Sequence, residues 1–458
     1  MSDQTSPNSP AGHSRRQFIK GASAVVAGGA VLGLNQRIAR SAHVGGSDEI
    51  KIGLIGCGGR GRAAAAQALE TKGKVTLWSV GDAFADNMQG TLDALTKQVG
   101  ENAGNKDSLF YESRVECPSE RQFVGFDAYK GVIDSGVDLV ILATPPGFRP
   151  IHFEAAVEAD KHIFAEKPVA VDGPGVRRFL AANEVAKAKN LMVAIGLQRR
   201  HDQRYVEAIE KIHAGDIGEI PLTRVYWNGG GLWVRPRKPE QTEMEYQMRN
   251  WYYFNWLCGD HIVEQHIHNL DIGNWIRNKL PVEAHGLGGR QVRTGKDYGE
   301  IFDHHAVEYT YDDGTKMMSQ CCHIDGSWSA VDEHAHGCKG IAHLDDGRGP
   351  EIITADGKWR SKAKKVDNHH QEHHDMFAAL RRGEIYNEGD NGAHATMTAI
   401  LGRMATYSGK KITWDEALNS TLDLSPKKYA FDADPPVLPG KDGFYAIAVP
   451  GVTDVLNG

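Results

Sequence analysis

The clearest chemical signal in the sequence comes from three glycines and one acid. Gly56, Gly58 and Gly61 follow the apolar run 50–55 and precede an alanine-rich run that predicts a helix. This strand–turn–helix order is typical of a dinucleotide site, because the glycines let the backbone approach a pyrophosphate and the helix N-terminus offers it free N–H groups. Asp82 ends the next apolar run, about 20 residues further on, where an acid accepts hydrogen bonds from a ribose 2′-hydroxyl and repels a 2′-phosphate. The pattern therefore predicts NAD rather than NADP.

A second group of reactive side chains lies between Gly259 and Asp271. If this segment is one helix, two of its histidines and two of its carboxylates share an arc of about 80° at about 100° per residue. That arc holds His261, Glu264, His268 and Asp271 and contains no Lys or Arg. A solvated helix face usually mixes Lys with Glu, so this face indicates a site. On the residues alone two chemistries stay open, because Glu264 and His268 at i, i+4 could share a metal ion or take part in proton transfer.

Two polar segments stand where strands are expected to end. The nearly continuous apolar run 137–143 predicts a fully buried strand and is followed by Thr144-Pro145-Pro146. The run 162–165 predicts a shorter strand and is followed by Glu166-Lys167-Pro168. Open α/β sheets bind their ligands at the carboxyl ends of strands, so both segments are candidates for a site. Without further context, a lone Lys-Pro would be interpreted as a surface turn.

In this order and spacing, the glycine turn, Asp82, Thr144-Pro145-Pro146 and Glu166-Lys167-Pro168 resemble the Gfo/Idh/MocA oxidoreductase family, over roughly residues 48–420. That family includes glucose–fructose oxidoreductase, inositol dehydrogenase and NAD-dependent glycosidases. The resemblance implies that NAD is the cofactor. The cofactor-binding residues that it implies are Gly56, Gly58, Gly61, Asp82, Thr144, Pro145, Glu166 and Lys167.

The resemblance also implies catalytic roles. Lys167 is expected beside the nicotinamide and the substrate hydroxyl, and His268 is expected to shuttle the proton of that hydroxyl. An acidic-x-x-x-His pair of the family maps onto Glu264 and His268, with Glu in place of the commoner Asp. We expect Glu264, one helical turn before His268, to orient its imidazole. Acid–base chemistry is preferred to a metal, and no metal is expected, because Lys167 and NAD already supply a complete hydride mechanism.

Composition limits the classes of partner. The chain has 458 residues, a net charge of -7 and 41% hydrophobic residues, which is ordinary for a soluble protein and gives no reason to expect nucleic acid or an anionic membrane. Its six cysteines are too few and too irregularly spaced for a disulfide framework or a zinc finger.

The N-terminal residues indicate an export signal rather than a part of the folded protein. Arg15-Arg16 begins a twin-arginine motif, and a short Gly/Ala-rich apolar stretch, 21–34, follows it. That stretch is unlike a transmembrane helix of about 20 strongly apolar residues. We expect export by the twin-arginine (Tat) pathway to a bacterial periplasm, after the cofactor has bound, because this pathway carries folded proteins.

The expected fold is α/β: an N-terminal Rossmann dinucleotide-binding domain and a C-terminal α+β domain with a large, mainly antiparallel sheet. The expected boundaries are a signal segment 1–47, the NAD-binding domain 48–172, the substrate-binding domain 173–425 and a surface tail 426–458. Strands of the second sheet are predicted at 220–227, 284–292, 306–311, 316–324, 339–344 and 351–354. A homo-oligomer formed through this sheet is expected.

An aromatic-rich region precedes the His/Glu segment. Trp233, Tyr246, 251–253 and Trp256 crowd into two dozen residues after a Gly-rich loop. Core packing and stacking against the CH faces of a sugar ring explain this density equally well.

The sequence therefore predicts an NAD-dependent oxidoreductase that oxidises a secondary hydroxyl of a sugar, cyclitol or glycoside. The alternative is a redox-neutral, NAD-dependent glycosidase that oxidises, eliminates, hydrates and reduces in turn, which suits an exported enzyme with poor access to an NAD pool. A non-catalytic sugar-binding protein is a third class, disfavoured by the presence of both Lys167 and His268.

Overall fold

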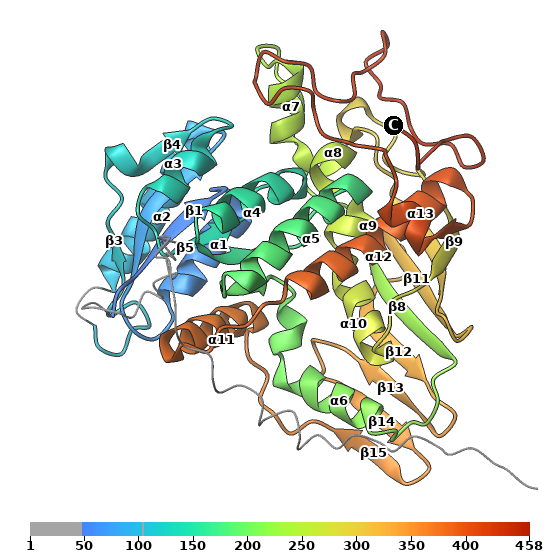
Figure 1. Cartoon of the computed structure of the whole chain (residues 1–458). Coiled ribbons are helices and arrows are strands. Elements are labelled where there is room, and N and C mark those ends of the chain that lie inside the picture. The colour runs from blue at the N-terminus through green and yellow to red at the C-terminus, as the bar shows by residue number, and fades with distance from the viewer. Residues whose placement is uncertain (1–47, 103–104) are drawn as a thin grey trace, which may run out of the picture. The chain divides into compact units, whose positions relative to one another are not determined.

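The computed structural model describes residues 48–102 and 105–458, so the predicted twin-arginine segment 1–47 lies outside the described residues. Two sheets organise the described chain, one built from parallel strands and one mainly antiparallel (Figure 1). The predicted fold class is confirmed. Within the described residues, no helix combines the length and the apolar character needed to cross a membrane.

The first sheet has the strand order β3-β2-β1-β5-β6-β7, and β4 also pairs with β2. All of its pairs are parallel. Its strands are β1 (Ile50–Ile55), β2 (Val75–Asp82), β3 (Arg114–Val115), β4 (Gln122–Val124), β5 (Leu139–Leu142), β6 (His162–Ala165) and β7 (Val193–Ile195). Since crossover helices cover both faces of a parallel sheet, its central strands β1 and β5 are apolar apart from Lys51 near the start of β1.

Helices on the two faces of this sheet belong to two separate cores. In β5, Val140 and Leu142 pack in one core with α3 (Ala128–Asp134), α4 (Arg149–Glu158) and α5 (Gly173–Ala188). Leu139 and Ile141 face the other core, with α1 (Gly59–Leu69), α2 (Ala85–Glu101) and α11 (Asn368–Arg382). Helix α11 therefore returns from late in the chain to complete the packing of the first sheet.

The second sheet has the strand order β15-β14-β13-β12-β8-β11-β10-β9-β16, and only the β8–β11 pair is parallel. Its strands are β8 (Leu222–Gly229), β9 (Glu283–Gly289), β10 (His304–Thr310), β11 (Lys316–His323), β12 (Ala330–His336), β13 (Gly340–Leu344), β14 (Glu351–Thr354), β15 (Gly357–Arg360) and β16 (Ile412–Thr413). The six predicted strands correspond to β8, β9, β10, β11, β13 and β14. Strand β12 was not predicted, because Asp332, His334 and His336 make one face polar and the buried face carries Glu333 in place of an apolar residue.

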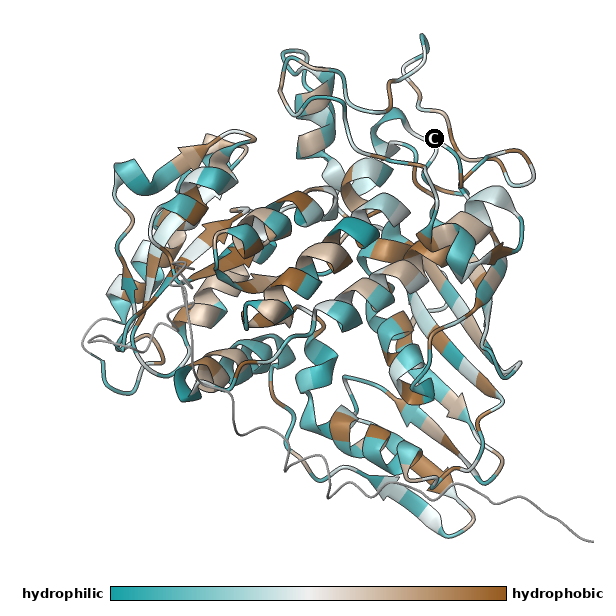
Figure 2. Ribbon diagram, viewed as in Figure 1, coloured by the Kyte–Doolittle hydropathy of each residue, from teal (hydrophilic) through white to brown (hydrophobic). Residues whose placement is uncertain are grey.

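One face of the second sheet is covered by helices and the other is open. Helix α6 (Gln203–His213) packs on β12 to β14, and α10 (Ile267–Arg277) and α12 (Gly389–Ser408) pack on the middle strands. In Figure 2, hydrophobic and hydrophilic bands alternate along these strands, as expected for a half-buried sheet. The open face carries exposed apolar side chains: Leu287, Met318, Ile341 and Ile353.

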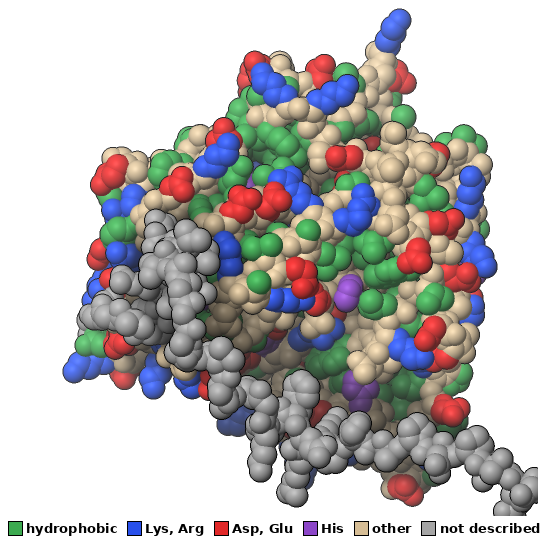
Figure 3. Space-filling view, in the orientation of Figure 1, with side chains coloured by type: hydrophobic (Ala, Val, Ile, Leu, Met, Phe, Trp, Pro, Cys, Tyr) green, Lys and Arg blue, Asp and Glu red, His purple; other side chains and the backbone are tan. Residues whose placement is uncertain are grey.

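The remaining elements are short. They are α7 (Glu243–Arg249), α8 (Asn255–Cys258), α9 (His261–Glu264) and α13 (Trp414–Leu418), with 3-10 helices at Ser119–Arg121, Pro146–Phe148, Gln198–His201, Trp251–Tyr253 and Lys296–Tyr298. The predicted tail region holds no helix or strand, and Tyr445 within it donates a hydrogen bond to Glu243 (2.5 Å). On the face shown in Figure 3, acidic and basic side chains are interspersed, with no extended patch of one sign.

The segment 259–271 is not the single helix that the periodicity predicts. It is divided into α9 and α10, and Gln265 and His266 lie between them. The N–H of His266 bonds to the carbonyl oxygen of His261, five residues back, so one extra residue is accommodated in the turn. Consequently His261 does not share a face with Glu264 and His268, and Asp271 pairs with Arg200 instead.

Candidate active site

The glycine turn has the geometry that a bound dinucleotide needs. Gly56 has a φ of +98°, and a Cβ there would lie 2.5 Å from the backbone N of Thr144. A Cβ at Gly61 would lie against the carbonyl oxygen of Gly56, so the start of α1 packs directly on the turn. By contrast, a Cβ at Gly58 would meet nothing within 4 Å. Gly58 therefore leaves free space in front of the N-terminus of α1, where phosphate oxygens bind.

Asp82 lies at the end of β2, beside this turn. Its Oδ2 accepts a hydrogen bond from the N–H of Cys57 (2.6 Å), and its Oδ1 accepts one from the N–H of Phe84 (2.8 Å). Burial raises the pKa of the Asp82 carboxyl, and the two backbone hydrogen bonds oppose that shift. The turn and the acid are thus held together, as the fingerprint requires.

A cavity of about 410 Å³ brings the predicted residues together. The predicted site residues that line it are Gly56, Gly58, Asp82, Thr144, Pro145, Glu166, Lys167, Glu264 and His268. Gly61 is not a lining residue; it supports the turn from behind. The glycine turn and the three candidate catalytic side chains therefore share one cavity, which is the arrangement that hydride transfer between a nicotinamide and a substrate needs.

Lys167 follows β6 and reaches Glu264 at the end of α9. Its Nζ donates to the Glu264 backbone carbonyl (2.5 Å) and to Glu264 Oε1 (3.1 Å). Both side chains are mostly buried. Glu264 therefore holds Lys167, and no hydrogen bond joins Glu264 to His268 in the part of the chain that the structure describes. Glu264 was expected to orient the His268 imidazole, but in the structure it contacts Lys167 instead. The break after α9 rotates His268 away from Glu264.

His268 lies at the start of α10, with its ring stacked on Trp227 at a centroid distance of 6.0 Å. Burial lowers its pKa well below 6.5, and the nearby charges of Lys167 and Arg199 lower it further. Its ring nitrogens have no hydrogen-bond partner among residues 48–102 and 105–458. His268 is thus a neutral imidazole with an available lone pair, which is the form that accepts a proton.

Two arginines of the cavity were missed by the sequence analysis. Arg60, inside the glycine motif, donates to Glu166 Oε1 at 2.5 Å. Burial acts to raise the pKa of Glu166, but Arg60 outweighs it and keeps the carboxylate ionised. Arg149, fully buried at the start of α4, donates to the carbonyl oxygens of Leu142 (2.5 Å) and Pro168 (3.3 Å). For Arg60, the only signal in the sequence was its place at the fifth position of the Gly56–Gly61 motif.

The aromatic-rich region is divided between core and cavity. Tyr246, Tyr252, Tyr253 and Trp256 are buried in one apolar cluster, as the packing interpretation expects. Trp251 lines the cavity, and Trp233 is 42% exposed. Trp227, in β8, adds a second indole to the cavity wall. Two tryptophans are therefore placed where a sugar ring could stack.

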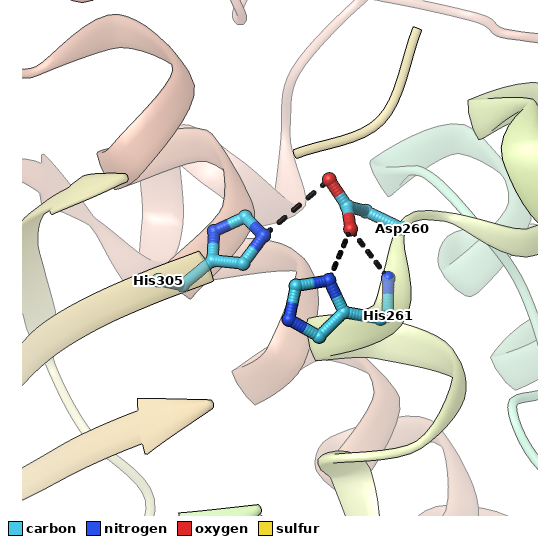
Figure 4. A group of neighbouring side chains, drawn as sticks. All are labelled: Asp260, His261 and His305. Carbon is cyan, nitrogen blue, oxygen red and sulfur yellow. Dashed lines mark hydrogen bonds and ion pairs between the residues drawn. The ribbon is translucent and has the colours of Figure 1, made fainter. Parts of the chain in front are cut away.

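The alternative that Glu264 and His268 bind a metal ion is not supported by further metal-ligand side chains around them in the described part of the chain. Among the described residues, groups of three or more metal-ligand types form at Asp260-His261-His305 and at Asp332-His334-His343, and neither group contains Glu264 or His268. The first group is fully buried (Figure 4).

The Asp260 carboxylate in this buried group is already saturated with hydrogen bonds. Oδ1 accepts from the backbone N and the Nδ1 of His261 (2.5 and 2.9 Å). Oδ2 accepts from Tyr407 (2.5 Å) and from the N–H of Phe302 (2.9 Å), and His305 Nε2 lies 3.4 Å away. Burial acts to raise the pKa of Asp260, but His305 and His261 outweigh it and hold that pKa well below its usual range. The Asp260 carboxylate therefore belongs to a buried structural network, although Nε2 of His261 has no hydrogen-bond partner among the described residues.

Comparisons with known proteins agree with this geometry. Residues 50–197 match a family model described as GFO_IDH_MocA, an oxidoreductase family with an NAD-binding Rossmann fold. The inositol 2-dehydrogenase of Rhizobium meliloti is 24% identical over 284 residues, which cover 60% of this chain and 79% of that protein. Matches to further curated relatives cover 28% to 62% of those proteins' lengths.

Solved structures share the fold over about four fifths of this chain. The scyllo-inositol dehydrogenase of Lactobacillus casei, solved with bound NAD(H) and scyllo-inositol, has a TM-score of 0.57 and 18% identity, and the match covers 80% of this chain and 99% of that one. The aldose-aldose oxidoreductase of Caulobacter crescentus, in complex with glycerol, has a TM-score of 0.61 and 17% identity with the same coverage. The prediction that NAD is the cofactor is confirmed.

Proposed function

We propose that this chain, which is an NAD-dependent oxidoreductase of the Gfo/Idh/MocA family, oxidises one secondary hydroxyl of a sugar, cyclitol or glycoside. The observation that carries the proposal is the presence of Lys167 and the neutral His268 in the same cavity as the Gly56–Gly61 turn. The named relatives that act on inositols and aldoses support a polyhydroxylated substrate.

The chemistry divides between the cofactor and three side chains. Bound NAD⁺ supplies the hydride acceptor. His268 takes the hydroxyl proton on a ring nitrogen, and the Lys167 ammonium donates a hydrogen bond to the same oxygen as it becomes a carbonyl. Glu264 fixes Lys167 through the contact of 3.1 Å. The balance is one C–H hydride to the cofactor and one proton to His268, which leaves a ketone.

The test is turnover by purified protein with added NAD⁺. Inositol isomers, aldoses and p-nitrophenyl glycosides are incubated with the protein while NADH absorbance and released nitrophenol are both followed. Accumulation of NADH with a ketone product, lost in Lys167→Met, supports the dehydrogenase. Release of nitrophenol without NADH would instead assign the redox-neutral glycosidase reaction, and neither signal with any compound would contradict both.

We also propose that Arg15-Arg16 directs export to a periplasm by the twin-arginine pathway. Replacing both arginines by lysine should retain the protein in the cytoplasm of an expressing bacterium. Unchanged periplasmic protein in that variant would contradict the proposal.

A homo-oligomer formed through the second sheet is a further proposal. The open face of this sheet exposes Leu287, Met318, Ile341 and Ile353, and exposed apolar faces of this kind are typical of subunit interfaces. Ile341 and Ile353 are cross-strand partners, so Ile341→Lys with Ile353→Lys should convert an oligomer to a monomer in light scattering. Wild-type protein that is already a monomer at micromolar concentration would contradict it.

A further inference from the structure

Gln265 occupies the break between α9 and α10 and lines the cavity beside Glu264. Its side chain is anchored at one end only. The amide oxygen, Oε1, lies 2.6 Å from Nε2 of His323, the last residue of β11. The amide nitrogen has no partner within the described residues, and it is the end of the side chain that a ligand in the cavity could reach.

The direction of this hydrogen bond follows from the next residue in the network. Arg293 Nη2 lies 2.5 Å from Nδ1 of His323. A guanidinium has donors only, so His323 Nδ1 must accept and carries no proton. A neutral imidazole then has its hydrogen on Nε2, which donates to Gln265 Oε1. Gln265 is thereby fixed with its NH₂ group, two donors, available to the cavity.

The groups behind Gln265 are rigid. Arg293 is 2% exposed, and it is held by hydrogen bonds to the Phe302 carbonyl (2.7 Å) and, through its backbone N, to Asp303 (3.0 Å). The His323 ring packs on the ring of His261 at a centroid distance of 4.6 Å. His261 is in turn fixed by Asp260, in the saturated group of Figure 4. The buried network therefore sets the orientation of one amide in the cavity.

We propose that Gln265 determines specificity by donating a hydrogen bond to a substrate oxygen next to the reacting hydroxyl. This inference rests on the proposed function and narrows its substrate class to vicinal polyols. Lys167 donates to the reacting oxygen and His268 accepts its proton, so Gln265 supplies a second donor for the neighbouring hydroxyl. His323 and Arg293 are positioning residues, because they act through Gln265.

The test compares Gln265→Met, which removes the donor, with Gln265→Glu, which still accepts from His323 but presents an oxygen to the cavity. The probe is whichever inositol isomer the wild type oxidises. Loss of one hydrogen bond to substrate should raise KM about tenfold in Gln265→Met, and more in Gln265→Glu, while the Kd for NADH is unchanged. Gln320→Glu, the same change on the exposed side of β11, is the matched control.

Substitutions of His323 test its role in positioning Gln265. His323→Leu should reproduce the rise in KM, and His323→Gln, which keeps a donor toward Gln265, should restore most of the wild-type value. A KM in Gln265→Met within twofold of the wild type would overturn the proposal. A higher Kd for NADH with an unchanged polyol KM would also overturn it, by assigning the donor to the cofactor.

One measurement separates this inference from the proposed function. If the wild type oxidises no inositol or aldose, the proposed function fails, and the network is then examined by ¹⁵N signals of the histidine ring nitrogens, assigned by comparison with His323→Gln. A protonated Nε2 and an unprotonated Nδ1 at His323 support the orientation of Gln265. The opposite tautomer overturns it whatever the substrate.

Discussion

Two polar groups lie on either side of the break at Gln265 and differ in how completely they are satisfied. On the N-terminal side, Asp260, His261 and His305 are fully buried, and the carboxylate has a donor for each of its lone pairs. On the other side, Lys167 and His268 face a cavity, and the imidazole has no partner among the described residues. Each region pairs a histidine with a nearby carboxylate: Asp260 is adjacent to His261, and Glu264, which also lines the cavity, is four residues before His268. Residue type alone therefore does not separate a structural network from a reactive one; unsatisfied polar atoms facing a cavity do.

The largest effect on activity should come from substitutions of Lys167 and His268, the group that faces the cavity. Lys167→Met and His268→Gln should each lower kcat about 10²- to 10⁴-fold, the usual loss for a positioned proton-transfer group. Because the two side chains act on one oxygen, the double variant should be little worse than the poorer single one. Binding of NADH, followed by its fluorescence, and the free energy of unfolding should both stay near wild type. His285→Ala, on an exposed strand position, is the control.

The saturated group should show the opposite pattern. Asp260→Leu removes a fully buried charge and leaves its donors unpaired, which should lower the free energy of unfolding by about 3–5 kcal/mol in denaturant titrations. The folded fraction should keep a kcat within a few fold of wild type. A stable Asp260→Leu variant without activity would show that the two groups are not separable in this way. Asp312→Asn, at an exposed turn, serves as the control.

Acid should weaken both groups through their histidines. Burial, partly offset by Asp260, lowers the pKa of His261 to about 4, whereas an unfolded histidine has a pKa near 6.5. Below about pH 6.5 the unfolded chain therefore binds a proton that the folded protein does not. The free energy of unfolding should fall as the pH falls from about 6.5 to 4, by up to about 1.4 kcal/mol per pH unit for each such histidine.

This pH dependence can be assigned to single residues. His261→Asn should reduce the slope of the free energy of unfolding against pH by the contribution of about one proton. His201 shifts the other way: burial lowers its pKa, but the hydrogen bonds to Asp375 and Glu388 outweigh this and raise it to about 10. Its stabilising contribution is complete below pH 6.5 and is lost only as the pH rises toward 10, so it does not mask the acid slope. Unfolding free energies that are flat between pH 6.5 and 5 would contradict the assignment.

The smallest effect is expected at Asp82, which combines features of the two groups. Two backbone N–H groups satisfy part of its carboxylate, yet it lines the cavity. Asp82→Ala should narrow the preference for NAD over NADP by about tenfold, in Kd values from fluorescence titration, because the charge that repels a 2′-phosphate is lost. Asp86→Ala, on the exposed side of α2, should leave the ratio unchanged. Tighter binding of NADP than of NAD by the wild type would refute the role of Asp82.

The fold was largely predictable because its signals are local. Continuous apolar runs predict buried parallel strands, and the glycine spacing predicts the turn after β1. The site was only partly predictable, because contacts far apart in the chain decide it. A helical wheel placed His261 with Glu264 and His268, but the bond from His266 to His261 breaks the helix and sends His261 into the buried group. Likewise, no local pattern pairs Lys167 with Glu264, which lie 97 residues apart in the sequence.

Helix α11 has a consequence for how the protein is made. Its Met376 and Phe377 belong to the same core as β1 and α1, and Arg381 donates to the backbone carbonyls of Asp48 and Lys74. During synthesis, the part of this core that α11 covers therefore stays exposed to solvent until about 330 further residues have been translated, from β1 at Ile55 to α11 at Arg382. Contacts of such long sequence separation form late. The nucleotide-binding half should therefore not mature ahead of the rest, and a ribosome-bound chain ending before residue 368 should be protease-sensitive and should bind no cofactor.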